Sequence, residues 1–197
     1  MIERIFAGLV LIFLSPLFLI LYVLVKLDSK GPFLFTQKRA GKGKKPFCIY
    51  KIRTMVEKAE KLKSKYLKYN QADGPVFKIY DDPRYTKVGK WLARFGIDEL
   101  PQFINILKGE MSLVGPRPLP VEEAQKIPKK YEKRFSVKPG IFSSWVASGA
   151  FHNDFDHWMK LDIEDVENKG WWWDVRVFLR SIKFVVVNIL KKSINFC

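Results

Sequence analysis

The sequence predicts an α+β, mainly helical fold in which a membrane helix precedes a compact globular domain. Residues 5–25 form an apolar run without a charged side chain. Residues 31–55 alternate polar and apolar positions on both sides of a glycine-containing turn, and much of the remainder has apolar residues at helical spacing between Gly and Pro stops. We therefore expect a membrane helix at residues 1–28 and a globular domain with a short β-hairpin at residues 29–197.

Charge restricts the class of partner. The chain has 197 residues, of which 48% are hydrophobic, so general disorder is excluded. Its 35 Lys and Arg against 20 Asp and Glu give a net charge of +15, which predicts an anionic partner such as a nucleic acid, a phosphorylated substrate or an acidic membrane. No nucleic-acid-binding module is recognisable, so we expect no nucleic acid partner.

The N-terminal apolar run is long enough to cross a hydrocarbon core. It exceeds the apolar part of a signal peptide and lacks a cleavage site, so we expect it to be retained. Ser15 and Pro16 lie in its middle, and the missing proline N–H predicts a kink there. Two interpretations stay open from these residues alone: a bent spanning helix, or a helix that breaks at Ser15 and Pro16 and returns to the same membrane face. The basic domain that follows suits the cytoplasmic side, and the two cysteines form no disulfide framework.

The hairpin is predicted around the turn AGKGKK, with Phe33, Phe35, Phe47 and Ile49 at period two. Helices are predicted at residues 57–69, from Asp82 or Pro83 to residue 95, from Asp98 to the stop at Gly109, over residues 121–135 with an interruption at Pro128, and from residue 171 onward. The last of these has a broad apolar face with basic neighbours, which suits either a membrane interface or a core helix.

Asp98 and Glu99 are the candidate catalytic residues. Asp98 is expected at the N-cap of its helix and Glu99 in the first turn, where helix N–H groups favour negative charge. The two acids have a complete structural explanation as a helix cap. The same position also keeps a carboxylate ionised and oriented, so that Asp98 could attack phosphorus while Glu99 takes a proton or helps to hold a divalent cation.

A diphosphate substrate needs cationic groups around its phosphates. Arg117 is the most constrained candidate because two prolines surround it in GPRP. Individually, each of the other basic side chains is also explained as a solvated charge. The complete set of candidate phosphate ligands is Lys51, Arg53, Arg84, Arg94 and Arg117.

The order of these segments resembles the bacterial sugar transferase family, the small monotopic phosphoglycosyl transferases. The resemblance rests on FTQKRAGKGKKPFCIYKIRTM, DDPRYTKVGKWLARFGIDELPQFINILKGEMSLVGPRP and YEKRFSVKPG, which follow an apolar Ser-Pro segment. It covers essentially the whole chain, and DELPQ through LVGPRP is its most specific part.

The resemblance implies transfer of a sugar 1-phosphate from a UDP-sugar to a polyprenyl phosphate, usually undecaprenyl phosphate, with Mg2+ and release of UMP. Asp98 then corresponds to the nucleophile that forms a covalent phosphosugar intermediate, and Glu99 to the second catalytic acid; both are the expected metal ligands. It also implies a re-entrant helix, attachment to the bacterial inner membrane with the catalytic domain in the cytoplasm, and an early role in surface glycan assembly, with downstream glycosyltransferases as further partners.

The chain departs from the family pattern at three positions. Ala93 stands where members often have Arg, and Val146 and Ala150 stand where members often have Gln and Arg. These departures concern the contacts to the sugar nucleotide, whose sugar the sequence does not identify. The alternative function is a non-enzymatic basic protein of the membrane surface, whose acids only cap a helix.

Overall fold

Two units make up the described part of the chain. The computed structural model describes residues 1–149 and 152–194, with side chains described up to residue 187. The first unit comprises Met1–Gln37, Cys48–Gln71 and Phe77–Gly109, and the second comprises Lys38–Phe47, Ala72–Val76 and Glu110–Cys197. Helices predominate and two small sheets accompany them, so the predicted α+β class is confirmed.

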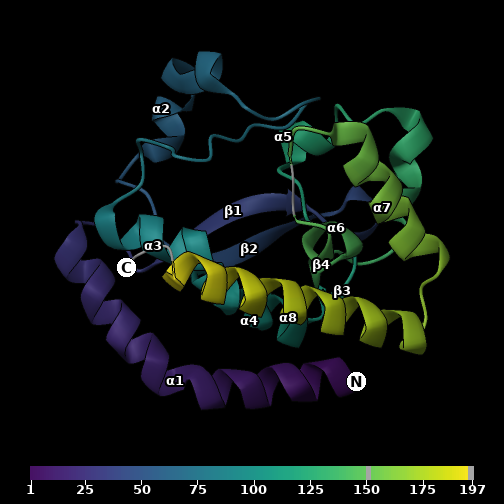
Figure 1. The fold of residues 1–197 in the computed structure, drawn as a ribbon, viewed down its shortest axis with the longest axis horizontal. Coiled ribbons are helices and arrows are strands. Elements are labelled where there is room, and N and C mark those ends of the chain that lie inside the picture. The colour runs from purple at the N-terminus through teal and green to yellow at the C-terminus, as the bar shows by residue number, and fades with distance from the viewer. Residues whose placement is uncertain (150–151, 195–197) are drawn as a thin grey trace. The chain divides into compact units, whose positions relative to one another are not determined.

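Helix α1 (Ile2–Asp28) exposes most of its apolar side chains. Its buried residues are Ala7, Leu21 and Val25. By length and composition it is the one helix in the described residues that could cross a membrane. Figure 1 shows α1 as two arms joined by a bend. An apolar surface of this extent is stable when lipid covers it.

Within the Ser-Pro pair, the serine hydroxyl replaces the backbone hydrogen bond that the proline cannot make. Pro16 lies inside α1 and has no N–H to donate to the carbonyl of Ile12, four residues earlier. The hydroxyl of Ser15 donates to that carbonyl instead, at 2.7 Å. The backbone therefore remains helical from Ile2 to Asp28, and the re-entrant path remains a prediction.

The predicted hairpin is confirmed. Strand β1 (Leu34–Ala40) pairs with β2 (Pro46–Ile52), and the turn between them contains a short 3₁₀ helix, η1 (Lys42–Lys44). Gly43 in this turn has a φ of 62°, a conformation that glycine adopts without steric cost. Strand β2 carries Lys51 close to its end.

The helix expected from Asp82 or Pro83 begins later. Helix α2 (Ala59–Tyr66) and η2 (Leu67–Tyr69) occupy the predicted segment 57–69, but α3 spans only Lys87–Phe95. The predicted start was wrong because the carboxylate of Asp82 accepts the backbone N–H of Arg84 at 3.0 Å and holds this segment in a turn. Thr86 is then the N-cap, and its hydroxyl accepts from the N–H of Gly89 at 3.0 Å.

The expected N-cap at Asp98 was also wrong. Gly96, with a φ of 70°, ends α3 as predicted and is itself the cap of the next element, η3 (Ile97–Gln102). Asp98 therefore lies inside the first turn of a 3₁₀ helix, which continues into α4 (Phe103–Lys108) and ends at Gly109. A 3₁₀ turn has three residues per turn, so the buried stripe shifts: Phe103, Asn105 and Ile106 are buried in α4, whereas Leu107 is 41% exposed.

The second unit contains a parallel pair of strands that the sequence did not reveal. Strand β3 (Ser112–Val114) pairs with β4 (Gly140–Phe142), and Ser112 lies opposite Gly140. A Cβ on Gly140 would lie 2.2 Å from the backbone nitrogen of Gly115. The glycine therefore allows the two chain segments to approach this closely.

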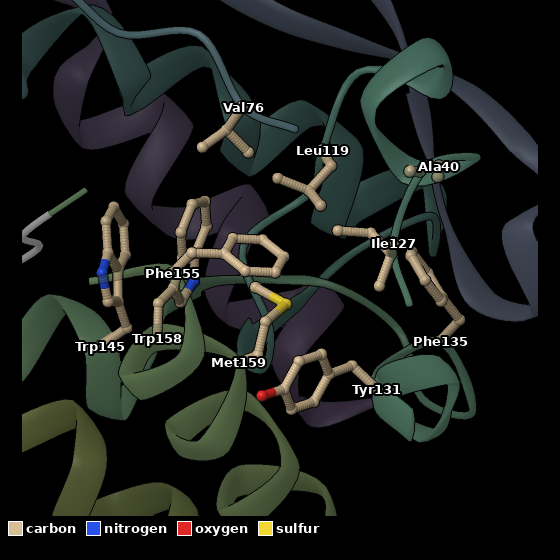
Figure 2. Close-up of a cluster of buried hydrophobic side chains, with 11 residues drawn as sticks. Ala40, Val76, Leu119, Ile127, Tyr131, Phe135, Trp145, Phe155, Trp158 and Met159 are labelled. Atoms are coloured by element: carbon tan, nitrogen blue, oxygen red, sulfur yellow. The ribbon is translucent and has the colours of Figure 1, made fainter. Parts of the chain in front are cut away.

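Helices make up most of the rest of the second unit. Pro128 divides the segment 121–135, as predicted, into α5 (Val121–Ala124) and η4 (Lys129–Phe135). Then follow α6 (Ser144–Ala147), α7 (Phe155–Glu167) and the long α8 (Trp171–Ile194). Figure 2 shows the core of this unit, in which Trp145 and Trp158 stack with ring centroids 4.4 Å apart.

Buried carboxylates fasten the helices of this unit. Asp165 on α7 accepts from the N–H of Ser144 at 2.8 Å and from the indole N–H of Trp173 at 3.0 Å, which connects α6, α7 and α8. Asp162 on α7 is fully buried and accepts from Arg134 of η4 at 2.6 Å. These contacts explain why polar positions of α7 face the core.

Candidate active site

Asp98 and Glu99 lie in the first turn of η3, at the start of a helical element. The free N–H groups of such a turn favour negative charge. Asp98 is 7% exposed, so its carboxylate is held rather than freely solvated. Gly96 sets this geometry because its left-handed conformation turns the chain directly from α3 into η3.

Lys51 is a cation that meets both acids. Its ammonium nitrogen lies 2.7 Å from Oε1 of Glu99 and 3.8 Å from Oδ2 of Asp98. The side chains of all three residues are at most 20% exposed. The contact is therefore partly shielded from water, which strengthens the attraction and restricts how the carboxylates can turn.

Tyr85 contributes a neutral polar group to the same surroundings. Burial, followed by repulsion from the negative charges of Asp98 and Asp82, raises the pKa of Tyr85 to about 12. The phenol therefore stays protonated at neutral pH. The backbone places it here, because Tyr85 forms an antiparallel bridge with Met55, shortly after the end of β2.

Arg84, a predicted phosphate ligand, is 6% exposed and contacts protein groups. Its guanidinium donates to Oδ2 of Asp82 at 2.6 Å and to the carbonyl of Ala59 at 3.1 Å. Burial raises the pKa of Asp82, but the hydrogen bonds and charge of Arg84 outweigh it and hold that pKa below its ordinary value. In this structure Arg84 thus connects α2 to the segment before α3.

Arg53, also a predicted phosphate ligand, contacts the C-terminal end of α1. Its Nη2 atom donates to the carbonyl of Ser29 at 2.6 Å and to that of Val25 at 3.2 Å. The side chain is buried, and Nε and Nη1 have no hydrogen-bond partner within the described residues. Lys51 and Arg53, two positions apart in the sequence, thus reach different partners in the structure.

The two remaining phosphate candidates lie in different units. Arg94 is in the last turn of α3, in the first unit, and is exposed. Arg117 is in the second unit, where its guanidinium lies 5.7 Å from the ring centre of Trp145. Its backbone carbonyl accepts from Arg134 at 2.9 Å, so both its side chain and its backbone contact the second unit. Their phosphate contacts remain predictions.

The acid pair suits Mg2+ only together with substrate oxygens. Within the described residues, no group of three or more His, Cys, Asp or Glu side chains could hold a metal ion. Mg2+ prefers oxygen ligands and is commonly bound by one or two carboxylates plus the phosphates of the substrate. Asp98 and Glu99 fit that mode of binding.

Of the two C-terminal positions that depart from the family pattern, the structure describes one. Val146 lies in α6 and is partly buried against the core of the second unit, whereas Ala150 lies outside the described residues. Sequence reasoning missed two polar residues of the first unit, Tyr85 and Asn105. Asn105 was detectable in principle, since a polar residue at an otherwise apolar helix position predicts a buried hydrogen bond.

Comparison with known proteins identifies relatives along nearly the whole chain. A family model described as bacterial sugar transferase matches residues 1–188. The galactosyl transferase CpsE of Streptococcus agalactiae is 42% identical over 181 residues, which cover 91% of this chain and 38% of that protein. The exopolysaccharide production protein ExoY of Sinorhizobium fredii is 34% identical over 186 residues, covering 92% of this chain and 82% of that protein.

A third relative has a name that states a reaction. The UDP-glucose:undecaprenyl-phosphate glucose-1-phosphate transferase of Escherichia coli is 34% identical over 190 residues, covering 91% of this chain and 38% of that protein. The chain thus spans about two fifths of the length of CpsE and of the Escherichia coli relative.

Proposed function

Because the chain belongs to the bacterial sugar transferase family, we propose that it transfers a sugar 1-phosphate from a UDP-sugar to a polyprenyl phosphate, such as undecaprenyl phosphate. The observation that carries the proposal is the arrangement of Asp98 and Glu99 in one helical turn, with Lys51 against both. The names of several relatives support the acceptor, and two of those names support a UDP-sugar donor.

The reaction has two steps at phosphorus. In the first, a carboxylate oxygen of Asp98 bonds to the β-phosphorus of the UDP-sugar while the bond from that phosphorus to the bridging oxygen breaks and UMP leaves. In the second, an oxygen of the polyprenyl phosphate bonds to the same phosphorus and the Asp98 oxygen leaves. The product is a polyprenyl diphosphate sugar, and Asp98 is again a carboxylate.

The neighbours of Asp98 support this chemistry. Lys51 reduces the negative charge that an approaching diphosphate meets, and it limits the rotation of both acids. Glu99, next to Asp98 in the same turn, is the proposed second acid, which takes a proton or helps to bind a divalent cation. Mg2+, when bound by Asp98 and Glu99 with substrate phosphates, supplies charge neutralisation. Arg94 and Arg117 are proposed further phosphate ligands, and so is Arg53, whose Nε and Nη1 atoms have no hydrogen-bond partner among the described residues.

The path of α1 supports a re-entrant membrane helix. Near the N-terminal end of α1, Arg4 donates to the carbonyl of Leu107 at 2.7 Å, and the rings of Phe6 and Phe103 are 6.4 Å apart. At the C-terminal end, the carboxylate of Asp28 accepts from the N–H of Val88 at 3.0 Å. A straight helix of this length would extend about 40 Å, more than the thickness of a hydrocarbon core, and would separate these ends.

This path fits the proposed substrates. A helix held by the same unit at both ends places that unit at one membrane surface, where a lipid phosphate and a water-soluble UDP-sugar meet. We place the protein at the cytoplasmic face of the bacterial inner membrane. Its product would start a surface glycan on which downstream glycosyltransferases act.

The covalent intermediate provides the test. Purified protein is incubated with a UDP-sugar radiolabelled in the sugar, without polyprenyl phosphate, across a panel of UDP-sugars. We expect label on the wild-type protein, release of UMP, and transfer of the label to lipid when polyprenyl phosphate is added. Asp98→Asn should remain unlabelled, whereas Asp81→Asn, a change to an exposed aspartate of the same unit, should label like the wild type.

Equal labelling of Asp98→Asn and wild type would exclude Asp98 as the nucleophile. Binding to liposomes without release of UMP from any UDP-sugar would instead support the non-enzymatic membrane-surface protein.

A further inference from the structure

Asn105 is a fully buried polar residue in the middle of α4. Its side chain is 0% exposed. Its Oδ1 atom accepts from the backbone N–H of Tyr50 at 3.1 Å, and its Nδ2 atom donates to the backbone carbonyl of Cys48 at 2.7 Å. One amide therefore contacts two backbone groups of β2 through both of its ends.

These two bonds fix where β2 lies along α4. The carbonyl of one strand residue and the N–H of the residue two positions later point to the same edge of a strand. The Asn105 amide occupies that edge as a neighbouring strand would. A slip of β2 by one residue would break both bonds and leave buried polar groups unpaired, so the register is well determined.

The strand held in this way carries Lys51. Lys51 follows Tyr50 directly, and its ammonium lies 2.7 Å from Glu99. Glu99 and Asn105 both belong to the continuous helical segment formed by η3 and α4. The segment thus contacts β2 through Asn105 and the Tyr50 backbone, and again through Glu99 and Lys51.

A second contact between α4 and β2 lies in solvent. The ammonium of Lys108 is 2.5 Å from the hydroxyl of Tyr50, but Lys108 is exposed. Exposed contacts of this kind contribute little to the position of a strand, because water competes for both partners. Of these two contacts between α4 and β2, the buried one made by Asn105 therefore contributes more to the register.

We infer that Asn105 is a positioning residue, which holds the Tyr50–Lys51 segment so that the Lys51 ammonium meets Glu99 and Asp98. The inference assigns the residue a role in the proposed phosphoryl transfer and rests on that function for its catalytic consequence. Its geometric consequence, the placement of Lys51, is measurable without any substrate.

The geometric test compares the reactivity of two lysines. Folded protein is treated with a trace of acetic anhydride, and acetylation of Lys51 is measured by mass spectrometry relative to exposed Lys61 in the same sample. We expect Asn105→Leu, which keeps the branching of the side chain and removes both bonds, to raise the Lys51 ratio several-fold. Asn70→Leu is the matched control, since it removes a side-chain bond to the N–H of Lys78 at 2.8 Å elsewhere in the same unit.

An unchanged ratio in folded Asn105→Leu would overturn the inference. If thermal unfolding measurements show that Asn105→Leu is not folded, Asn105→Asp takes its place. This variant keeps the acceptor for the N–H of Tyr50 and loses the donor to the carbonyl of Cys48. We expect Asn105→Asp to raise the Lys51 ratio as well, and an unchanged ratio in this variant would overturn the inference.

The catalytic test is a double-mutant cycle measured by UMP release. Asn105→Leu should lower kcat about 10- to 100-fold, the loss that a displacement of about 1 Å causes, with little change in KM. In a Lys51→Met background the same change should cost less than about twofold, because the residue acts through Lys51. Full additivity would indicate a purely structural role and overturn the inference. If the wild type releases no UMP, the proposed function fails, while the Lys51 acetylation ratio still decides the inference.

Discussion

The ammonium of Lys51 lies 2.7 Å from Glu99 and 3.8 Å from Asp98, so one cation on β2 serves two acids on η3. The sequence places these residues 47 and 48 positions apart, and only the fold brings them together. Two partly buried carboxylates on adjacent residues repel each other and any phosphate that approaches. The lysine therefore makes the acid pair compatible with an anionic substrate.

Replacement of Lys51 should reduce catalysis strongly. We expect Lys51→Met to lower kcat/KM for UMP release about 10²- to 10³-fold, the range observed when one preorganised group that stabilises charge is removed. Lys51→Arg, which keeps the charge with a different shape, should retain part of the activity. Lys61→Met, at an exposed lysine on α2, is the control and should match the wild type. Wild-type activity in Lys51→Met would exclude this role.

Local patterns predicted the hairpin, the stop at Gly96 and the helix from residue 171 onward, because each depends on neighbouring residues. The error at Asp98 has a local cause as well: Gly96 serves as the end of α3 and the cap of η3, so no residue remains between them for an aspartate cap. A three-residue strand such as β3 has too little pattern to be recognised, and its partner β4 lies far along the chain.

The partners of buried charges could not be predicted either, because these partners also lie far along the chain. Lys51 and Arg53 are two positions apart, a spacing that puts both side chains on one face of an extended segment and suggests a common anion. The structure gives Arg53 the carbonyls at the end of α1 and gives Lys51 the acids of η3. Long-range contacts such as these decide which basic residues meet solvent, substrate or protein, and sequence spacing contains no record of them.

The ion pair between Arg134 and Asp162 should matter far more for stability than its neighbour. Both pairs join η4 to α7, but the side chains of Arg134 and Asp162 are 1% and 0% exposed, whereas those of Lys133 and Glu167 are 55% and 52% exposed. Asp162→Ala leaves a buried guanidinium without its charge partner, so we expect a loss of about 3–5 kcal/mol in the free energy of unfolding. Glu167→Ala should cost less than about 1 kcal/mol. Chemical denaturation of both variants provides the comparison, and similar losses would contradict it.

Asp162 should also make stability depend on pH. Burial raises its pKa to about 6, and the charge and hydrogen bonds of Arg134 offset only part of that effect. The folded state therefore binds a proton more tightly than the unfolded state, whose aspartates titrate near pH 3.9. The contribution of Asp162 to the free energy of unfolding should fall as the pH rises from about 4 to about 6, by an amount on the order of 3 kcal/mol, and then stay constant.

The difference in unfolding free energy between wild type and Asp162→Asn isolates this contribution, because the amide does not titrate. Measured between pH 4 and pH 7, that difference should favour the wild type most at the acidic end. A difference that grows with rising pH would mean that the pKa of Asp162 is lowered instead.

Gly31 should be intolerant of a side chain because of Arg53. Its φ is 123°, and a Cβ there would lie 2.2 Å from Nη1 of Arg53. Gly31→Ala should therefore displace the guanidinium from the end of α1 and lower the melting temperature. Gly43→Ala is the control: its φ is also positive, at 62°, but a Cβ would meet nothing within 4 Å. The control should show only backbone strain, about 1–2 kcal/mol, and equal losses in the two variants would show that Arg53 is not constrained by Gly31.

The re-entrant path predicts which membrane face exposes the N-terminus. Ile2 is 79% exposed at the start of α1, and Lys61 is exposed on α2 of the same unit. Ile2→Cys and Lys61→Cys, each made in a background in which Cys48 and Cys197 are serine, are treated with a membrane-impermeant thiol reagent in vesicles of both orientations. Since Arg4 and Asp28, near the two ends of α1, contact one unit, we expect both cysteines to react in inside-out vesicles and neither to react in right-side-out vesicles. A spanning helix would instead expose Ile2→Cys and Lys61→Cys on opposite faces, because about 30 Å of hydrocarbon would separate them.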